Sequence, residues 1–240
     1  MLLRTTVVSR GRAERSAAAA VEWLGMRRAH LAVVGGLVLL AFVQRPGATT
    51  FDTKLDLTES PWDFLGRALS LWNPQANFGE LQNQAYGYLF PVGPFFAVGE
   101  VAGVPPWVVQ RLWSALLLVL AYSGVVALCR ALPVGTRWSR ILAGVAYALC
   151  PRMVTTLGPI SAEALVVAVL PWTVLPLLRW RTWGIRRSAA LSSLGVAGMG
   201  AANATLTLAV LPLAGLVALT RPRGVRLRLS AWWAACVLLA

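Results

Sequence analysis

Six of the nine acidic residues of this 240-residue chain fall in one stretch, residues 45–105, between two apolar segments. They are Asp52, Asp56, Glu59, Asp63, Glu80 and Glu100. Asp52 and Asp56 flank Lys54, the only lysine. A carboxylate can act as the general base for a hydroxyl nucleophile, and carboxylates can help to hold a divalent cation. Acidic residues in a loop are also commonly plain solvated surface, so the residues alone leave these alternatives open.

A second polar run in the same stretch has side chains suited to sugars. Its neutral donors and acceptors match the hydrogen-bonding needs of sugar hydroxyls; they are Gln82, Asn83, Gln84 and Tyr86. Lys54 and Arg152 offer positive charge that would balance a phosphate leaving group. These residue types suit the transfer of a sugar from a donor that carries phosphate.

The elements that position these residues are mostly apolar. Hydrophobic residues make up 58% of the chain, charged residues 13%, and the mean hydropathy is +0.66. Soluble domains carry about a quarter charged residues, so the composition indicates a membrane protein. The net charge of +13 does not indicate nucleic-acid binding, because the arginines form short clusters at the borders of apolar runs, as membrane topology favours.

Apolar runs close to the roughly 20 residues that cross a bilayer predict an all-α, multi-span membrane protein. The expected spans cover residues 28–44, 106–129, 141–153 with a break at Cys150-Pro151, 164–178, a helical hairpin over 188–220 with its tip at Asn203, and a last span from about 230 that is cut at Ala240. The chain therefore looks like a fragment. Every arginine cluster then falls on one side, which is the cytoplasmic side by the positive-inside rule.

This topology divides the chain into three parts. Residues 1–28 form a cytoplasmic basic tail, and residues 29–240 form the membrane domain. Within that domain, residues 45–105 form a long extracytoplasmic loop that would carry the active site. The chain is thus expected in the bacterial plasma membrane, with its N-terminus in the cytoplasm.

Within the long loop, residues 61–72 are predicted to form a helix. Ser60 stands before it as the N-cap, and Pro61 takes the first helical position. The polar residues of the helix form one narrow stripe, and apolar residues fill the remainder; the polar residues are Asp63, Arg67 and Ser70. We expect this helix to lie along the membrane surface. The alternative is a helix packed beneath a soluble cap.

The sequence also supports predictions for single residues within the spans. Arg111, near the outer end of the second span, is expected to extend its guanidinium to the membrane interface. Gly35 and Gly36 predict close packing of the first span against a neighbour. The cysteines lack the spacing of zinc ligands and are expected to be small buried apolar side chains; they are Cys129, Cys150 and Cys236. We predict no cofactor, with a divalent cation at the loop carboxylates as the open alternative.

One part of the chain also resembles a known family. Asp52-Thr53-Lys54-Leu55-Asp56-Leu57 is followed by Phe78-Gly79, by Leu81-Gln82-Asn83-Gln84-Ala85-Tyr86-Gly87-Tyr88-Leu89-Phe90-Pro91 and by Gly93-Pro94-Phe95-Phe96. In this order the motifs resemble the start of the actinobacterial alpha-(1→3)-arabinofuranosyltransferase D family, which are large membrane glycosyltransferases of the GT-C class. The likeness covers roughly residues 30–220 and is most specific between Asp52 and Phe96.

The resemblance implies a multi-span GT-C-type helical core and an inverting arabinofuranosyltransferase, which is a pentosyltransferase. The implied donor is a polyprenyl-phosphate arabinofuranose, and the implied acceptor is arabinan of the cell envelope. Enzymes of this class place a catalytic carboxylate in the first outside loop. Asp52 matches that position and is the first candidate for the general base, with Asp56 as the second. Family members are far longer than this chain.

Three other interpretations remain open from the sequence. The first is a related GT-C enzyme that uses another lipid-linked sugar, such as mannose. The second is a transporter or flippase of lipid-linked sugars, although such proteins commonly carry ionisable groups in mid-membrane and the span interiors here are nearly free of acids. The third is an inactive fragment of the enzyme.

Overall fold

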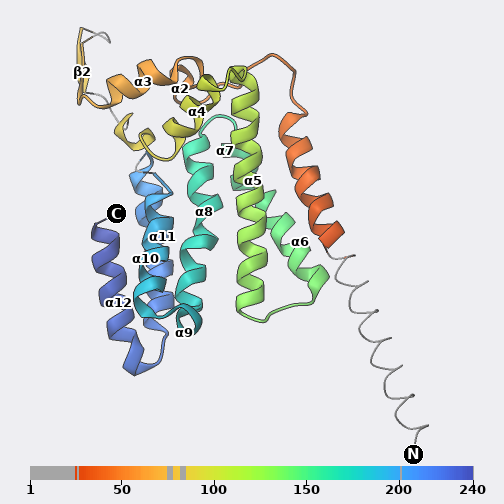
Figure 1. Ribbon diagram of the computed structural model, residues 1–240, viewed down its shortest axis with the longest axis vertical. Helices are drawn as coiled ribbons and strands as arrows, with labels where there is room; N and C mark the ends of the chain where they lie inside the picture. The colour runs from red at the N-terminus through yellow and green to blue at the C-terminus, as the bar shows by residue number, and fades with distance from the viewer. Residues whose placement is uncertain (1–24, 26, 75–77, 82–84, 201, 240) are drawn as a thin grey trace, which may run out of the picture.

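A row of long helices forms the body of the protein (Figure 1). The computed structural model describes all residues except 1–24, 26, 75–77, 82–84, 201 and 240, so most of the predicted tail and Gln82, Asn83 and Gln84 lie outside the described residues. The first helix covers residues 27–42. The later long helices are α5 (Pro106–Ala131), α6 (Arg137–Ala148), α8 (Ser161–Leu178), α10 (Ile185–Ala197), α11 (Ala204–Leu219) and α12 (Arg223–Leu238).

Helix α8 lies between two groups of helices. It packs against α5 on one side and against α10 and α11 on the other, while α6 packs on α5 and α12 packs on α10 (Figure 1). Among the described residues, α5 and α8 are the two helices that are long and apolar enough to cross a membrane. The 26 residues of α5 extend about 39 Å at the α-helical rise, which exceeds the thickness of a bilayer core.

Close contacts between these helices are made through glycine. A Cβ at Gly124 would lie 2.8 Å from Pro171 of α8, one at Gly144 would lie 2.7 Å from Tyr122 of α5, and one at Gly195 would lie 2.6 Å from Thr173 of α8. Small residues let helix backbones approach in this way. The prediction for Gly35 and Gly36 is wrong for the described residues, because nothing lies within 4 Å of a Cβ built at either position.

The predicted helices are largely confirmed, with differences at their ends. The break at Cys150-Pro151 separates α6 from the short helix α7 (Pro151–Thr156). The hairpin is formed by α10 and α11, and Asn203 caps the start of α11 by accepting a hydrogen bond from the Leu206 N–H at 2.9 Å. The last helix begins at Arg223 rather than near residue 230, because Pro222 pre-sets the backbone for a helix start.

Shorter elements gather over one end of the helices, which we call the loop end (Figure 1). They are α2 (Leu55–Glu59), α3 (Pro61–Ala68), strands β1 (Trp72–Asn73) and β2 (Glu80–Leu81), the 3-10 turn η1 (Ala85–Tyr88), α4 (Val92–Val101) and α7. The two strands pair in antiparallel fashion. One hydrophobic core connects this end to the helices, and it includes Phe64, Tyr88, Phe96 and Trp113.

Helix α3 is shorter than predicted. It ends at Ala68 instead of residue 72, and β1 follows. The Ser70 hydroxyl donates to the Trp72 carbonyl at 2.9 Å and accepts from the Trp72 N–H at 3.2 Å. Serine side chains that take backbone partners in this way compete with helix formation, so the polar stripe predicted to include Ser70 stops at Arg67.

Candidate active site

The segment that carries Asp52 is fixed along the loop end of α5. The Gln110 side chain binds both backbone groups of Thr50: Oε1 accepts from its N–H at 2.6 Å and Nε2 donates to its carbonyl at 2.7 Å. The neighbouring Arg111 donates to the Thr50 hydroxyl at 2.7 Å and to the Ala48 carbonyl at 2.9 Å. These four bonds take the place of the backbone hydrogen bonds that a strand or a helix would supply.

The other side of the segment rests on the start of α8. The Thr53 N–H donates to the Pro159 carbonyl at 3.1 Å. Asp52 Oδ1 accepts from the Thr53 N–H at 2.6 Å, from the Thr53 hydroxyl at 3.0 Å and from the Ser161 N–H at 3.4 Å. The first turn of a helix attracts negative charge, so the start of α8 favours the carboxylate. Among the described residues, Oδ2 of Asp52 has no hydrogen-bond partner, which leaves one oxygen able to accept a proton.

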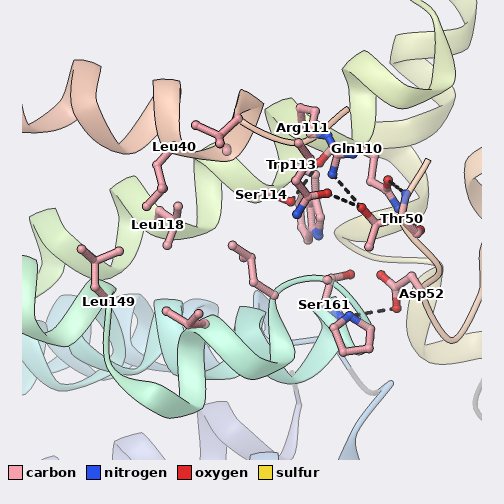
Figure 2. Close-up of a pocket in the computed structure, with 17 residues that line it drawn as sticks. Leu40, Thr50, Asp52, Gln110, Arg111, Trp113, Ser114, Leu118, Leu149 and Ser161 are labelled. Atoms are coloured by element: carbon pink, nitrogen blue, oxygen red, sulfur yellow. Dashed lines mark hydrogen bonds between the residues drawn. The ribbon is translucent and has the colours of Figure 1, made fainter. Parts of the chain in front are cut away.

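Asp52 lies on the wall of a cavity of about 430 Å³ between the first helix, α5 and the α7–α8 segment (Figure 2). Polar side chains gather at one end of this cavity; they are Gln44, Thr50, Asp52, Gln110, Arg111, Ser114 and Ser161. The remainder of the wall is apolar and includes Leu40, Val43, Leu118, Leu149, Val154 and Leu157. The cavity therefore suits a ligand with one polar part and one apolar part.

The structure corrects the expectation for Arg111. Its side chain does not reach the interface but is buried, with 3% of the residue exposed. The reason is that the segment from Ala48 to Thr50 folds over the end of α5 and satisfies both terminal nitrogens of the guanidinium. Sequence reasoning missed Gln110 and Arg111 as site residues. The available signal was the pair of polar residues at the outer end of an otherwise apolar span.

Asp56 faces a different cavity. This second cavity has a volume of about 290 Å³ and is lined by Lys54, Asp56, Phe64, Arg67, Asn73, Glu80, Leu81 and Ala85. Asp56 lies within α2 and forms an ion pair with Arg67 at 2.6 Å, whereas Asp52 precedes that helix. The two aspartates thus do not share a helix face, and the structure separates the first candidate from the second.

Tyr86 and Arg152, which were also predicted as site residues, are not part of the wall of the cavity that contains Asp52. Tyr86 is 49% exposed. Arg152 forms an ion pair with Glu163, which also accepts a hydrogen bond from the Asn203 amide at 2.8 Å. Arg152 is not part of the wall of either cavity. Within the part of the chain that the structure describes, histidine, cysteine and carboxylate side chains form no group of three or more that would hold a metal ion.

Tyr88 supports the turn between the two cavities. It is 4% exposed, and its hydroxyl is hydrogen-bonded to the side chain of Thr53. Burial raises the pKa of Tyr88; the bond to Thr53 opposes this shift, and the nearby charges of Asp52 and Asp56 add to it. The phenol therefore stays neutral at physiological pH and links the core to the residue that follows Asp52.

Comparison with known proteins assigns this arrangement of helical body, capping loop and half-polar cavity to the GT-C class of glycosyltransferases. Residues 36–240 match the family model described as alpha-(1→3)-arabinofuranosyltransferase, N-terminal GT-C domain. The chain therefore belongs to the alpha-(1→3)-arabinofuranosyltransferase family and represents its N-terminal GT-C domain.

Individual relatives give the same result. An alpha-(1→3)-arabinofuranosyltransferase of Mycobacterium tuberculosis is 49% identical over 221 residues, and one of Mycolicibacterium smegmatis is 48% identical over 213 residues. A cryo-electron-microscopy structure of the arabinofuranosyltransferase AftD from mycobacteria matches with a TM-score of 0.83 and 48% identity over 89% of this chain. The chain spans 16% and 15% of the length of the two relatives and 16% of the solved chain.

Proposed function

We propose that the protein to which this chain belongs transfers arabinofuranose from a polyprenyl-phosphate donor to arabinan of the cell envelope, with inversion and with Asp52 as the general base. The observation that carries the proposal is the placement of Asp52 on the wall of the half-polar cavity, with Oδ1 held by the backbone and side chain of its own loop. Membership of the arabinofuranosyltransferase family supports the sugar.

The cavity supports a lipid-linked donor. Its apolar wall is long enough to include residues of the first helix, of α5 and of α7, and it offers a path for the first isoprene units. The polar end would hold the sugar phosphate beside Asp52. A donor of this kind keeps its tail among apolar side chains while its reactive carbon reaches the loop.

The proposed step is a single displacement. An acceptor hydroxyl attacks the anomeric carbon as its proton passes to Asp52, and the bond between that carbon and the phosphate oxygen breaks. The electron pair of the broken bond stays on the phosphate, which leaves as polyprenyl phosphate. Oδ2 of Asp52, which has no hydrogen-bond partner among the described residues, is the oxygen we assign to the proton.

The second cavity suits the acceptor. Its lining includes charged and amide side chains together with the ring of Phe64, which is a mixture that binds sugar hydroxyls and sugar faces. Lys54 and Asp56 line this cavity, and Tyr86 is next in sequence to Ala85, which also lines it. In this proposal the turn at residues 52–56 separates a donor cavity from an acceptor cavity. Gln82, Asn83 and Gln84 lie outside the described residues and stay predicted substrate contacts.

The proposed topology places the loop end outside the cell and the N-terminus in the cytoplasm. The connections between α5 and α6, between α8 and α10 and between α11 and α12 lie at the opposite end of the helices (Figure 1), and arginines lie in or next to each of them, as the positive-inside rule requires. Large apolar side chains of α3 and of residues 69–72 are exposed and would meet the outer leaflet; they are Trp62, Leu69, Leu71 and Trp72. This pattern supports an α3 that lies along the membrane surface.

The test compares Asp52→Asn with Asp56→Asn in the full-length gene product. Transfer from a polyprenyl-phosphate arabinofuranose donor is measured in membranes, together with the amount of protein. Loss of a general base costs about 10²–10⁴-fold in rate, so Asp52→Asn should reduce kcat by at least about a hundredfold. Asp56→Asn, which loses an exposed ion pair and lies on the wall of the proposed acceptor cavity, should leave kcat within about threefold and act instead on the KM for the acceptor. Full activity of Asp52→Asn would remove Asp52 from the mechanism.

A further inference from the structure

Arg111 carries a positive charge in the interior without a negative partner. Its two terminal nitrogens donate only to neutral oxygens, those of Ala48 and Thr50. Its Nε is buried and has no hydrogen-bond partner. Within the described part of the chain no carboxylate pairs with Arg111. A buried charge is costly unless an opposite charge and hydrogen bonds compensate it, so the arrangement lacks an anion.

A second buried donor without a partner lies on the same cavity. The indole Nε1 of Trp113, which can only donate, has no hydrogen-bond partner and is buried. Trp113 and Arg111 both line the cavity that contains Asp52 (Figure 2). Buried donors are almost always paired, and these two stand two residues apart in α5. A ligand with several acceptor oxygens and a negative charge would satisfy both.

Resting on the proposed function, we propose that Arg111 and Trp113 form the subsite that binds the phosphate of the lipid-linked donor and of the leaving group. Arg111 supplies the charge and Trp113 supplies one further N–H. The bond from the anomeric carbon to the phosphate oxygen breaks with its electron pair on the phosphate, so the negative charge there increases during the reaction. An arginine fixed in advance stabilises that change more than it stabilises the bound donor.

The structure favours Arg111 over the cations named by the sequence. Among the residues that the structure describes, Arg111 is the one cationic side chain on the wall of the Asp52 cavity. Lys54 lines the other cavity, and Arg152 is paired with Glu163. Because Arg111 also binds the segment from Ala48 to Thr50, the same side chain sets the position of the phosphate and that of the loop that carries Asp52.

The binding test uses the full-length gene product in nanodiscs of zwitterionic lipid. Calorimetry measures the affinities for farnesyl phosphate, farnesol and inorganic phosphate. The wild type should prefer farnesyl phosphate to farnesol by about tenfold or more, the effect of a charge-assisted hydrogen bond. Inorganic phosphate alone should bind far more weakly, because it lacks the tail. Equal binding of farnesyl phosphate and farnesol by the wild type would overturn the proposal.

Variants assign the effect to the two residues. Arg111→Gln should abolish the preference for the phosphate, Arg111→Lys should keep part of it, and Trp113→Phe should reduce it a few-fold. The matched control is Arg140→Gln, since Arg140 is exposed at the opposite end of the helices and donates to Val134. A preference that survives in Arg111→Gln would refute the role of Arg111. Asp52→Asn should bind farnesyl phosphate at least as tightly as the wild type, so a failure of the general-base proposal is seen separately.

A structural measurement keeps the proposal testable where Arg111→Gln does not fold. Cryo-electron microscopy of the wild type with farnesyl phosphate should place the phosphate within roughly 4 Å of the Arg111 guanidinium, with its tail among the apolar residues of the same cavity. A phosphate bound at Lys54 or Arg152 instead would overturn the assignment.

Discussion

Gln110 holds Thr50 by both of its backbone groups, at 2.6 Å and 2.7 Å, across 60 residues of sequence. Gln110 is 5% exposed and belongs to the loop end of α5, whereas Thr50 stands two residues before Asp52. The position of the proposed base therefore depends on helix α5 and not on the loop alone. A side-chain amide carries its donor and its acceptor on neighbouring atoms, so it can bind the N–H and the carbonyl of the same residue.

We expect Gln110→Leu to displace the loop and to reduce both stability and rate. The change leaves the N–H and the carbonyl of the half-buried Thr50 without partners, at up to about 1–3 kcal/mol for each group. A displacement of about 1 Å of a catalytic group can reduce the rate by about a hundredfold. Thermal unfolding and kcat are the measurements, made in the full-length gene product.

The control is Gln44→Leu, since Gln44 also contacts Thr50 but is exposed and accepts only from its hydroxyl. Its effect on the melting temperature should be much smaller. A Gln110→Leu variant with wild-type stability and kcat would show that other contacts position Asp52. Gln110→Glu gives an intermediate case, because it keeps the acceptor for the Thr50 N–H and loses the donor to the carbonyl.

The close contact of α5 with α8 at Gly124 predicts that one added methyl group destabilises the protein. A Cβ at Gly124 would lie 2.8 Å from Pro171 and from the Trp172 indole nitrogen, so Gly124→Ala forces the two helices apart. Overpacking of this kind costs about 1–3 kcal/mol. Gly66→Ala is the matched control, because nothing lies within 4 Å of its added Cβ, and alanine in a helix is favoured over glycine by about 0.5–1 kcal/mol. The denaturation midpoints of the two variants should therefore shift in opposite directions from that of the wild type.

The buried phenol of Tyr88 leads us to expect that the protein loses stability at alkaline pH. Burial raises the pKa of Tyr88, so the folded protein holds the phenolic proton more tightly than the unfolded chain, whose tyrosine titrates near pH 10. The contribution is fully present below about pH 10 and is lost as the pH rises through the raised pKa. Tyr88→Phe should lessen the fall of the melting temperature above pH 10, and Tyr86→Phe, at an exposed position, should not. An unchanged alkaline profile in Tyr88→Phe would contradict the prediction.

The helices could be predicted from the sequence because hydropathy and arginine clusters act locally. The break before Pro151, the cap at Asn203 and the start of α5 all follow from one or two residues. The end of α3 could not be predicted in this way. Whether Ser70 continues a helix or binds the backbone of Trp72 depends on a competition between two local options, which differ little in energy.

The candidate site was predictable only in part. Asp52 is identified by its position after the first span and by resemblance, and the structure places it on a cavity wall. The pair of polar residues at one end of the apolar α5 marks Gln110 and Arg111 as unusual, but their roles depend on contacts with residues about 60 positions away, which the sequence does not give. The separation of Asp52 from Asp56 also required the structure, because the spacing of four residues is compatible with a shared helix face.

The ion pair of Arg152 with Glu163 provides the last test. Glu163 connects α7, α8 and the cap of α11, since it binds Arg152 and also accepts from Asn203 at 2.8 Å. The Glu163 side chain is 17% exposed and the Arg152 side chain is 54% exposed. We therefore expect Arg152→Gln to lower the free energy of unfolding by less than about 1 kcal/mol, as for other exposed pairs. Glu163→Ala should cost more, because it also leaves the Asn203 amide without its acceptor.

A double-mutant cycle of these two variants measures the coupling directly, with denaturation as the readout. The same proteins test the predicted contact of Arg152 with substrate, because a structural role changes stability and leaves KM unchanged. A rise of KM for donor or acceptor in Arg152→Gln that Arg152→Lys largely restores would support that contact. If KM stays constant while the cycle gives a clear coupling energy, Arg152 stabilises the packing of the three helices through Glu163 and does not bind substrate.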